Sequence, residues 1–266
     1  MKKQKKLGVA LGSGGVRGLA LIGALKALEK NNVKIDYLSG CSIGAFVAAH
    51  YALKGDLKNL SETASSNRRE IFLSFIQPSL RGGVASGNKL KQLIGRSFGA
   101  ARFEDLAIPT KVVATDLISG REVVYGSGPI APTLMASMAM PFFYRPVNYQ
   151  DKVLVDGALS NPVPDNIAKD MGADVVVAVN LHNYRLPENF KESSLYSASL
   201  RSMHIIFENL SHYSLLKESI LVEPAIKTSG LKTWKDFFLA RHDQEVIRAG
   251  ETAMKKVMPE ILRRLK

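Results

Sequence analysis

A serine stands between two glycines in the pentapeptide Gly40-Cys41-Ser42-Ile43-Gly44, a G-x-S-x-G pattern. An apolar stretch precedes it, and small residues with helical spacing follow it. A strand, a tight turn and a helix form the context in which such a serine becomes an exposed nucleophile. Gly40 and Gly44 allow the close backbone approach that this turn requires. The pattern nominates Ser42 as a nucleophile, although a loop with an uninvolved serine also fits the pentapeptide alone.

A glycine-rich stretch, Gly12-Ser13-Gly14-Gly15-Val16-Arg17-Gly18, follows the first apolar segment and precedes a helical pattern. Consecutive backbone N–H groups of Ser13, Gly14 and Gly15 beside a helix N-terminus predict an anion-binding site. Such a site can stabilise the oxyanion of an acyl-transfer reaction. A dinucleotide-binding loop is the rival interpretation, with Asp36 at a suitable distance. It is weakened because the third glycine of G-x-G-x-x-G falls on Arg17.

The base that would activate Ser42 has two kinds of candidate. An α/β-hydrolase would supply a histidine, but that fold places its nucleophile after several strands, and Ser42 follows the second predicted strand. We expect the histidines to be surface or half-buried helix residues; they lie at positions 50, 182, 204, 212 and 242. Asp156 follows a predicted buried strand and precedes Gly157, so it is a candidate carboxylate base. A turn aspartate is the alternative role for Asp156.

Composition narrows the setting. The chain has 266 residues, a formal net charge of +12 and one cysteine, which excludes an intramolecular disulfide framework and fits a reducing compartment. No apolar run reaches the 18 residues that suggest a membrane span. The N-terminal lysines resemble the start of a signal peptide, but the apolar run Leu7 to Leu11 is too short. We therefore expect a cytoplasmic protein.

Basic residues gather at both ends of the chain. Lysines crowd the N-terminus, and the C-terminal helix carries Lys255, Lys256, Arg263, Arg264 and Lys266. These termini predict a peripheral contact with an anionic membrane at the inner membrane surface, and a solvated surface is the alternative. We expect no nucleic-acid partner.

Strands alternate with helices along the first two thirds of the chain, which predicts one α/β layered domain. Its core covers about residues 6–182, and residues 183–266 are an extension packed on the same domain (1–266). Predicted strands cover residues 7–11, 33–39, 111–116, 121–125, 153–155, 175–180 and 219–225. Predicted helices cover residues 19–30, 43–53, 56–65, 88–98 and 194–217, with a basic helix at the end.

Three motifs in this order resemble the patatin-like phospholipase family, in its bacterial branch. They are the glycine-rich stretch at residues 12–18, the pentapeptide at 40–44 and Asp156-Gly157-Ala158. Similar intervening segments are Phe103-Glu104-Asp105-Leu106, Ala114-Thr115-Asp116-Leu117 and Ala136-Ser137-Met138-Ala139-Met140-Pro141. The likeness covers about residues 6–182 and is weaker around Val222-Glu223-Pro224 and Trp234.

The resemblance implies a three-layer α/β/α fold with a mostly parallel sheet and a serine–aspartate dyad without histidine. Ser42 would be the nucleophile and Asp156 its base. Ser13, Gly14 and Gly15 would form the oxyanion hole, supported by Arg17, with Gly157 next to the base. The implied activity is hydrolysis of acyl esters of phospholipids or lysophospholipids, with no metal or other cofactor.

Two features depart from the family pattern. Plant and toxin members begin the loop with Asp-Gly-Gly-Gly, whereas this chain has Gly12-Ser13, as many bacterial relatives do. Cys41 replaces a more usual threonine or glycine, and we expect a buried filler there. A phosphate- or nucleotide-binding regulatory module and an acyltransferase are the alternative functions.

Two apolar segments are candidates for an acyl-chain channel or a lid. They are residues 71–76, which include Phe72 and Phe75, and Phe142-Phe143-Tyr144. Ordinary core packing is the alternative for both segments.

Overall fold

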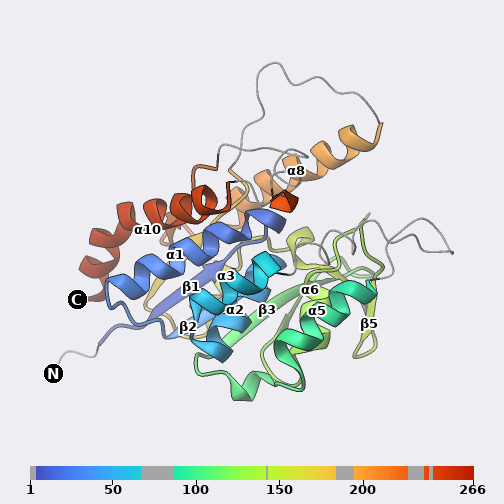
Figure 1. Ribbon diagram of the computed structural model, residues 1–266, viewed down its shortest axis with the longest axis horizontal. Helices are drawn as coiled ribbons and strands as arrows, with labels where there is room; N and C mark the ends of the chain where they lie inside the picture. Colours follow the sequence, from blue (N-terminus) through green and yellow to red (C-terminus); the bar gives the residue numbers. More distant parts are fainter. Residues whose placement is uncertain (1–3, 67–86, 142, 184–194, 227–236, 240–241) are drawn as a thin grey trace.

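Eight strands form one mixed sheet in the computed structural model of the protein, which describes residues 4–66, 87–141, 143–183, 195–226, 237–239 and 242–266 (Figure 1). The strand order is β5-β6-β3-β2-β1-β7-β8, and β4 also pairs with β3. The strands are β1 Leu7–Leu11, β2 Tyr37–Cys41, β3 Thr110–Asp116, β4 Glu122–Tyr125, β5 Val147–Tyr149, β6 Lys152–Asp156, β7 Val175–Val179 and β8 Ile220–Val222.

The central part of the sheet is parallel. Strands β3, β2, β1, β7 and β8 run in one direction, whereas β4 and β6 are antiparallel to β3, and β5 is antiparallel to β6. The carboxyl ends of the parallel strands therefore share one edge of the sheet. The predicted mostly parallel α/β sheet is confirmed.

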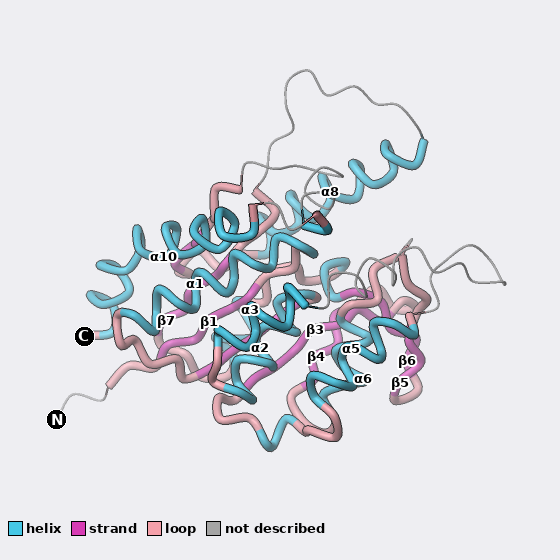
Figure 2. The backbone as a smooth tube through the Cα atoms, in the orientation of Figure 1, coloured by secondary structure: helices cyan, strands magenta, loops and turns pink. Residues whose placement is uncertain are grey.

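Helices cover both faces of the sheet (Figure 2). On one face lie α1 Leu19–Lys30, α2 Ile43–Lys54, α3 Leu57–Ser66, α5 Asn88–Phe98, α6 Ile130–Ser137 and α10 Asp243–Leu265. On the other face lie α7 Asp165–Asp170 and α8 Leu195–Ser214. Three short 3-10 helices complete the described elements: η1 Gly15–Gly18, η2 Phe103–Asp105 and η3 Gly157–Leu159.

Strand β1 shows why the sheet is buried on both sides. Leu7, Val9 and Leu11 point into the larger core with α1, α2 and α10, whereas Ala10 points the other way and contacts Val163. Successive side chains of a strand alternate between faces, so a strand covered on both sides is apolar throughout. This double burial fits the three-layer α/β/α arrangement.

The first half of the predicted element list agrees with the structure except at the second strand. The predicted strand 33–39 begins later, at Tyr37, and extends through Gly40 to Cys41. Asp36 accounts for the late start, because its carboxylate accepts a hydrogen bond from the N–H of Leu7 at 2.9 Å, just before the β1–β2 pairing begins. The helices after the pentapeptide agree: Gly55 ends α2 with φ 61°, and Asp56 accepts from the N–H of Lys58 at 2.8 Å.

Among the described α-helices and strands, α6, β5 and α7 have no counterpart in the sequence analysis. Helix α7 has six residues, and its Asp165 is fully buried. That carboxylate accepts hydrogen bonds from the N–H of Leu216 at 2.9 Å and the hydroxyl of Ser219 at 2.7 Å. Such elements depend on partners that are distant in sequence, so local patterns do not reveal them.

Helix α10 packs closely against α1. A Cβ at Gly23 would meet the backbone of Ile247, and a Cβ at Gly250 would meet the backbone of Ala20. Only glycine permits the two helices to approach in this way. The last turn of α10 lies at the amino-end edge of the sheet, because the Lys5 ammonium donates to the carbonyl of Arg264 at 2.8 Å.

Within the described residues, no helix is long and apolar enough to span a bilayer. Of the candidate acyl-channel or lid segments, residues 71–76 and Phe142 lie outside the described residues, as does Trp234. Tyr144 belongs to the main core, and Phe143 packs against it half-buried. Both side chains thus pack on the core, and a role in an acyl-chain channel stays a prediction.

Candidate active site

Ser42 occupies a sharp turn between β2 and α2. Its backbone has φ 54° and ψ −121°, a combination rarely adopted by residues other than glycine. A Cβ at Gly44 would strike the carbonyl oxygen of Leu11, and a Cβ at Gly40 would lie 2.6 Å from the Cα of Ala45. The glycines on both sides of Ser42 therefore permit this strained turn, through which the chain passes directly from β2 into α2.

The backbone of Ser42 is held by a serine that the sequence analysis did not single out as a site residue. The Ser42 N–H donates to the hydroxyl of Ser137 at 2.9 Å, and Ser137 is the last residue of α6. Ser137 is fully buried. Its segment appears in the family resemblance, but no local pattern indicates a contact with a residue 95 positions away.

Asp156 lies beside Ser42 at the end of β6. The Ser42 hydroxyl donates to Asp156 Oδ2 at 2.7 Å, and the N–H of Ala158 donates to Asp156 Oδ1 at 2.9 Å. Asp156 is paired with Ala114 of β3, while Cys41 is paired with Val113. The sheet register thus brings together two residues that are 114 positions apart.

Burial controls the protonation of Asp156. Asp156 is only 1% exposed to solvent. The loss of hydration raises the pKa of its carboxyl group to about 7. The hydrogen bonds from Ser42 and Ala158 act in the opposite direction, because they favour the charged form. A carboxylate with this pKa is a far better proton acceptor near neutral pH than an exposed aspartate.

Gly157 permits the close packing next to this carboxylate. A Cβ there would meet the carbonyl oxygen of Val113 and lie 3.0 Å from the sulfur of Cys41. Cys41 is fully buried against Ala158 and Phe207 of α8, and burial raises the pKa of its thiol well above the ordinary value. A neutral buried thiol is a weak nucleophile, so Cys41 acts as the expected core filler.

The glycine-rich loop leans against the serine turn. A Cβ at Gly44 would approach the Gly12 carbonyl oxygen to 2.7 Å, and one at Gly18 would strike the side chain of Ile43. Gly15 has φ 57° at the start of η1. Arg17 is 7% exposed and its Nε donates to the carbonyl of Gly14 at 3.3 Å. Arg17 thus braces the loop from within.

One of the three predicted oxyanion donors already has a hydrogen-bond partner within the fold. The N–H of Ser13 donates to the carbonyl of Pro162 at 2.8 Å, so this group is already engaged. The N–H groups of Gly14 and Gly15 have no backbone acceptor among the described residues. Of the three predicted donors, Gly14 and Gly15 therefore keep N–H groups that can bind a ligand.

The Ser13 side chain meets a histidine whose position contradicts our expectation. Its hydroxyl lies 2.6 Å from Nε2 of His182, and His182 is 2% exposed in the segment after β7. Desolvation, with the charge of Arg17 second, lowers the pKa of His182 well below its ordinary value, so the ring is neutral. His182 is therefore neither a surface nor a helix residue. The sequence feature that could have indicated this buried position is that His182 follows the carboxyl end of a continuous apolar strand, two residues after Asn180.

The other four histidines have no described contact with Ser42 or Asp156. His50 is 2% exposed on α2, where it stacks on Phe46, so the expected half-buried setting is wrong for it too. His204 and His212 lie on α8, and His242 is an exposed residue at the start of α10. None has a hydrogen bond to Ser42 among those described.

Comparison with known proteins identifies the family. The sequence profile described as patatin-like phospholipase matches residues 9–169, which include the glycine-rich loop, the serine turn and Asp156. The chain belongs to the patatin-like phospholipase family. The fold and the family expected from the motifs are confirmed.

Relatives of this patatin-like chain support the assignment. An NTE family protein of Mycobacterium tuberculosis is 33% identical over 178 residues, 66% of this chain and 49% of that protein. The lysophospholipase NTE1 of Pyricularia oryzae is 30% identical over 183 residues, 66% of this chain and 12% of that protein. The matched part of this chain thus corresponds to about half the length of the M. tuberculosis relative and a smaller share of the fungal one.

A solved structure shares the fold. The crystal structure of VipD from Legionella pneumophila superposes with a TM-score of 0.52 at 14% sequence identity, covering 97% of this chain and 67% of that one. At this level of identity the likeness concerns architecture alone.

Proposed function

We propose that this protein is a serine lipid acyl hydrolase in which Ser42 and Asp156 form a catalytic dyad. One observation carries the proposal. Ser42 lies on a strained turn at the N-terminus of α2, and its hydroxyl donates a 2.7 Å hydrogen bond to the buried carboxylate of Asp156. A serine needs an adjacent base before it can attack a carbonyl carbon, and Asp156 is the base in contact with it.

The reaction follows from these positions. Asp156 accepts the hydroxyl proton as Ser42 Oγ bonds to the acyl carbon, and the carbonyl oxygen becomes an oxyanion. When the tetrahedral intermediate collapses, the ester C–O bond breaks and the alcohol leaves with the proton from Asp156. Water then gives a proton to Asp156 and attacks the acyl-enzyme. The fatty acid leaves and the proton returns to Ser42.

The glycine-rich loop at residues 12–18, beside the Ser42 turn, would stabilise the oxyanion. We assign the N–H groups of Gly14 and Gly15 as its donors, because Ser13 is engaged with Pro162 and because the loop packs against Ile43 and Gly44. Losing one such donor typically lowers the rate about 10²–10³-fold. The positive end of α2 adds a favourable field at the same place.

The substrate class comes from the family. The profile is that of phospholipases, and one relative is named a lysophospholipase. We therefore assign phospholipids or lysophospholipids as substrates, with their carboxylic ester bond as the site of cleavage. In this proposal the Gly12 loop binds the oxyanion. The alternative function, a phosphate-binding regulatory module, differs because it requires no reactive serine.

Covalent labelling separates these possibilities. A fluorophosphonate probe should label the wild-type protein at one residue, seen as a single mass shift and located by peptide mass spectrometry. Ser42→Ala should abolish labelling and lower acyl-ester hydrolysis about 10⁴-fold or more. Asp156→Asn keeps the shape and should lower turnover about 10²–10⁴-fold. Ser66→Ala, at the exposed end of α3, is the matched control and should behave as wild type.

The proposal fails if wild-type protein is unlabelled and inactive on every phospholipid and lysophospholipid of a mixed extract. It also fails in its assignment of the base if Asp156→Asn retains near-full turnover. Mass spectrometry of the released products identifies which ester is cut.

A further inference from the structure

The turn between β3 and β4 presents two adjacent aliphatic side chains to solvent. Leu117 is 50% exposed and Ile118 is 80% exposed. Single exposed aliphatic residues are ordinary, but here two neighbours occupy the end of a protruding turn. We call Leu117 and Ile118 the apolar tip.

The turn that carries the apolar tip is well ordered by its own hydrogen bonds. The Asp116 carboxylate accepts from the N–H of Ile118 at 3.1 Å and from the hydroxyl of Ser119 at 2.8 Å. The N–H of Gly120 donates to the Asp116 carbonyl at 2.8 Å, and Gly120 has φ 71°. Because the turn is already formed, presenting the tip to a partner has little ordering cost.

Sheet register places the apolar tip on the same edge as the proposed dyad. Ala114 is paired with Asp156, and the chain of β3 continues from there through Asp116 to the tip. Ile118 is four residues beyond Ala114, so it can project at most about 13 Å past the level of the carboxylate. The carboxyl ends of the parallel strands point toward this edge, and the tip extends beyond them.

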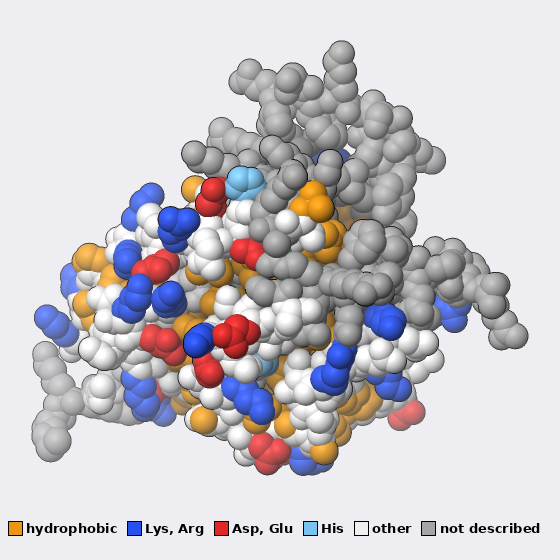
Figure 3. All heavy atoms as spheres, in the orientation of Figure 1, with side chains coloured by type: hydrophobic (Ala, Val, Ile, Leu, Met, Phe, Trp, Pro, Cys, Tyr) orange, Lys and Arg blue, Asp and Glu red, His pale blue; other side chains and the backbone are white. Residues whose placement is uncertain are grey.

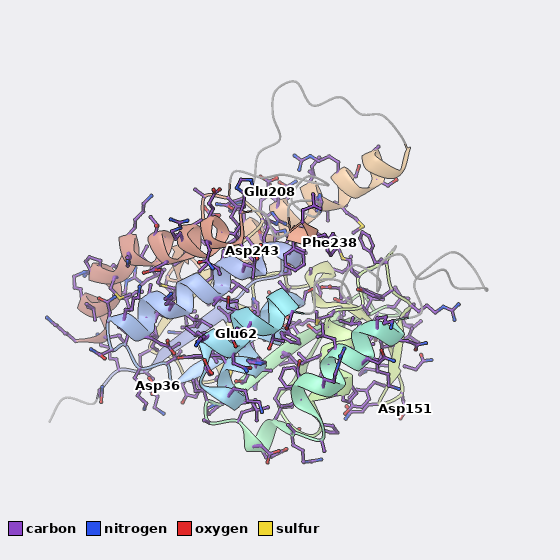
Figure 4. All side chains as sticks on the ribbon, in the orientation of Figure 1. Asp36, Glu62, Asp151, Glu208, Phe238 and Asp243 are labelled. Carbon is purple, nitrogen blue, oxygen red and sulfur yellow. The ribbon has the colours of Figure 1, made fainter. Side chains whose placement is uncertain are left out.

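A second turn lies next to the tip. The N–H of Leu117 donates to the carbonyl of Val153 at 2.8 Å, which brings in the turn between β5 and β6. Asp151 in that turn is labelled in Figure 4, on the side of the molecule opposite to Asp36 before β2. Arg121 just before β4 and Lys152 at the start of β6 are both exposed beside these turns, next to the exposed carboxylates of Asp151 and Glu122.

The basic chain termini lie at the opposite edge. The contact of Lys5 with the carbonyl of Arg264 places the last turn of α10 beside the start of β1. Figure 1 shows the C-terminal end of α10 on the side away from α8 and β5, and Figure 3 shows lysine and arginine side chains over α10 as well as on the opposite side of the molecule. A membrane held by this basic end would therefore not face Ser42.

We propose that the apolar tip inserts into a lipid surface and brings the dyad edge of the sheet to that surface. This inference rests on the proposed function, because the surface is that of the substrate aggregate. Aliphatic side chains at such an interface bury about 5–10 Å deep, at the level of the headgroups and upper acyl chains. Arg121 and Lys152 are then at the height of the headgroup phosphates. In this proposal the membrane contact is the edge of the sheet that carries the apolar tip, whereas the sequence analysis expected it at the basic termini.

The test separates docking from chemistry. Leu117→Ser/Ile118→Ser is prepared in the Ser42→Ala background, and binding is measured by co-sedimentation with phosphatidylcholine vesicles and with vesicles that also contain phosphatidylglycerol. Binding should fall at least about tenfold, since each buried aliphatic side chain contributes substantially to partition. Leu262→Ser, an exposed leucine in the last turns of α10, is the matched control and should bind as the parent does.

Activity supplies the second readout. With Ser42 intact, the tip variant should hydrolyse a monomeric short-chain ester at the wild-type rate and lose activity only on vesicles. Unchanged vesicle binding by the tip variant overturns the inference. So does loss of binding in Lys255→Gln/Lys256→Gln/Arg263→Gln instead, which would assign docking to the basic helix. If the tip variant changes only self-association on a sizing column, the tip is a contact between copies and the inference is wrong. None of these results bears on whether Ser42 is the nucleophile.

Discussion

At the scale of single residues, the Asp156 side chain is buried and accepts a hydrogen bond from the Ser42 hydroxyl. An ordinary aspartate has a pKa of about 3.9, whereas desolvation raises the pKa of Asp156 to about 7. A strongly perturbed pKa in a group that contacts a serine on a strained turn supports the proposal that Asp156 is the base for Ser42.

This pKa predicts the pH dependence of the reaction. The base must be deprotonated, so kcat/KM on a monomeric ester should rise with pH, reach half its maximum near pH 7 and then level off. A pH–rate profile with a soluble substrate checks this expectation. A profile that is already flat between pH 5 and 8 would contradict the assignment of Asp156 as the base.

The same shift makes a stability prediction of defined sign. Because the folded-state pKa of Asp156 is raised, ionising this group favours the unfolded chain. Its contribution therefore lowers stability as pH rises from about 4 through about 7. Asp156→Asn removes the ionisation, so the variant should gain in melting temperature relative to wild type at pH 8 and much less at pH 5. Thermal unfolding at the two pH values measures the difference.

Ser13 and His182 form a second buried pair, which shapes the loop without contacting the dyad in any described hydrogen bond. Ser13→Ala leaves Nε2 of His182 buried without its partner, so we expect a loss of about 1–3 kcal/mol in unfolding free energy. Denaturant titration measures it. If the Ser13 side chain only braces the loop, turnover per folded molecule should fall far less than in Ser42→Ala.

At the scale of elements, the close packing of α1 and α10 explains why glycine occupies two positions outside the candidate site. Gly23 of α1 and Gly250 of α10 each bring their own backbone against the other helix. This crossing attaches the C-terminal helix to the layer that also contains α2, the helix behind Ser42. The tail of the chain thus contributes to the same core as the candidate site.

Gly250→Ala tests this crossing. The new Cβ would overlap the Ala20 carbonyl, so the helices must separate, and we expect a destabilisation of about 1–3 kcal/mol. Gly95→Ala is the matched control, because Gly95 lies in the exposed part of α5 with no atom near its would-be Cβ. That change should stabilise the protein by up to about 1 kcal/mol. Equal effects of the two substitutions would contradict the packing argument.

At the scale of the whole molecule, the sheet separates two ends with different surfaces. Ser42, Asp156 and the apolar tip lie at the carboxyl ends of the parallel strands, whereas the basic last turn of α10 lies at the other edge. The basic residues Arg263 and Arg264 at the end of α10 therefore lie at the edge away from the candidate site.

This separation predicts the salt dependence of activity on vesicles. Docking through aliphatic side chains is insensitive to screening, whereas docking through exposed lysines weakens as salt is raised. Hydrolysis of phosphatidylcholine vesicles should therefore change less than about twofold between low and physiological ionic strength. A steep decline would indicate that the basic surface holds the protein on lipid.

The sequence by itself determined the features that depend on neighbours along the chain. Gly40 and Gly44 around Ser42, the small residues of α2, the Gly12 loop and the capping residues Gly55 and Asp56 all act over a few positions. Local backbone preferences and side-chain periodicity are encoded at that range, so the alternating strands and helices could be predicted, and the ordered motifs could be compared with a family.

Tertiary structure alone decided which of these groups touch. Sheet register places Asp156 beside Ser42, and the packing of α6 on the sheet brings Ser137 to the Ser42 N–H. Contact between two loops engages Ser13 with Pro162, and the direction of the strands leaves the basic end of α10 and the apolar tip at opposite edges. Hydrogen bonds form over about 3 Å between residues far apart in the chain, and no local pattern specifies that distance. Burial has the same origin, which is why the raised pKa of Asp156 and the neutral ring of His182 became evident only in the folded molecule.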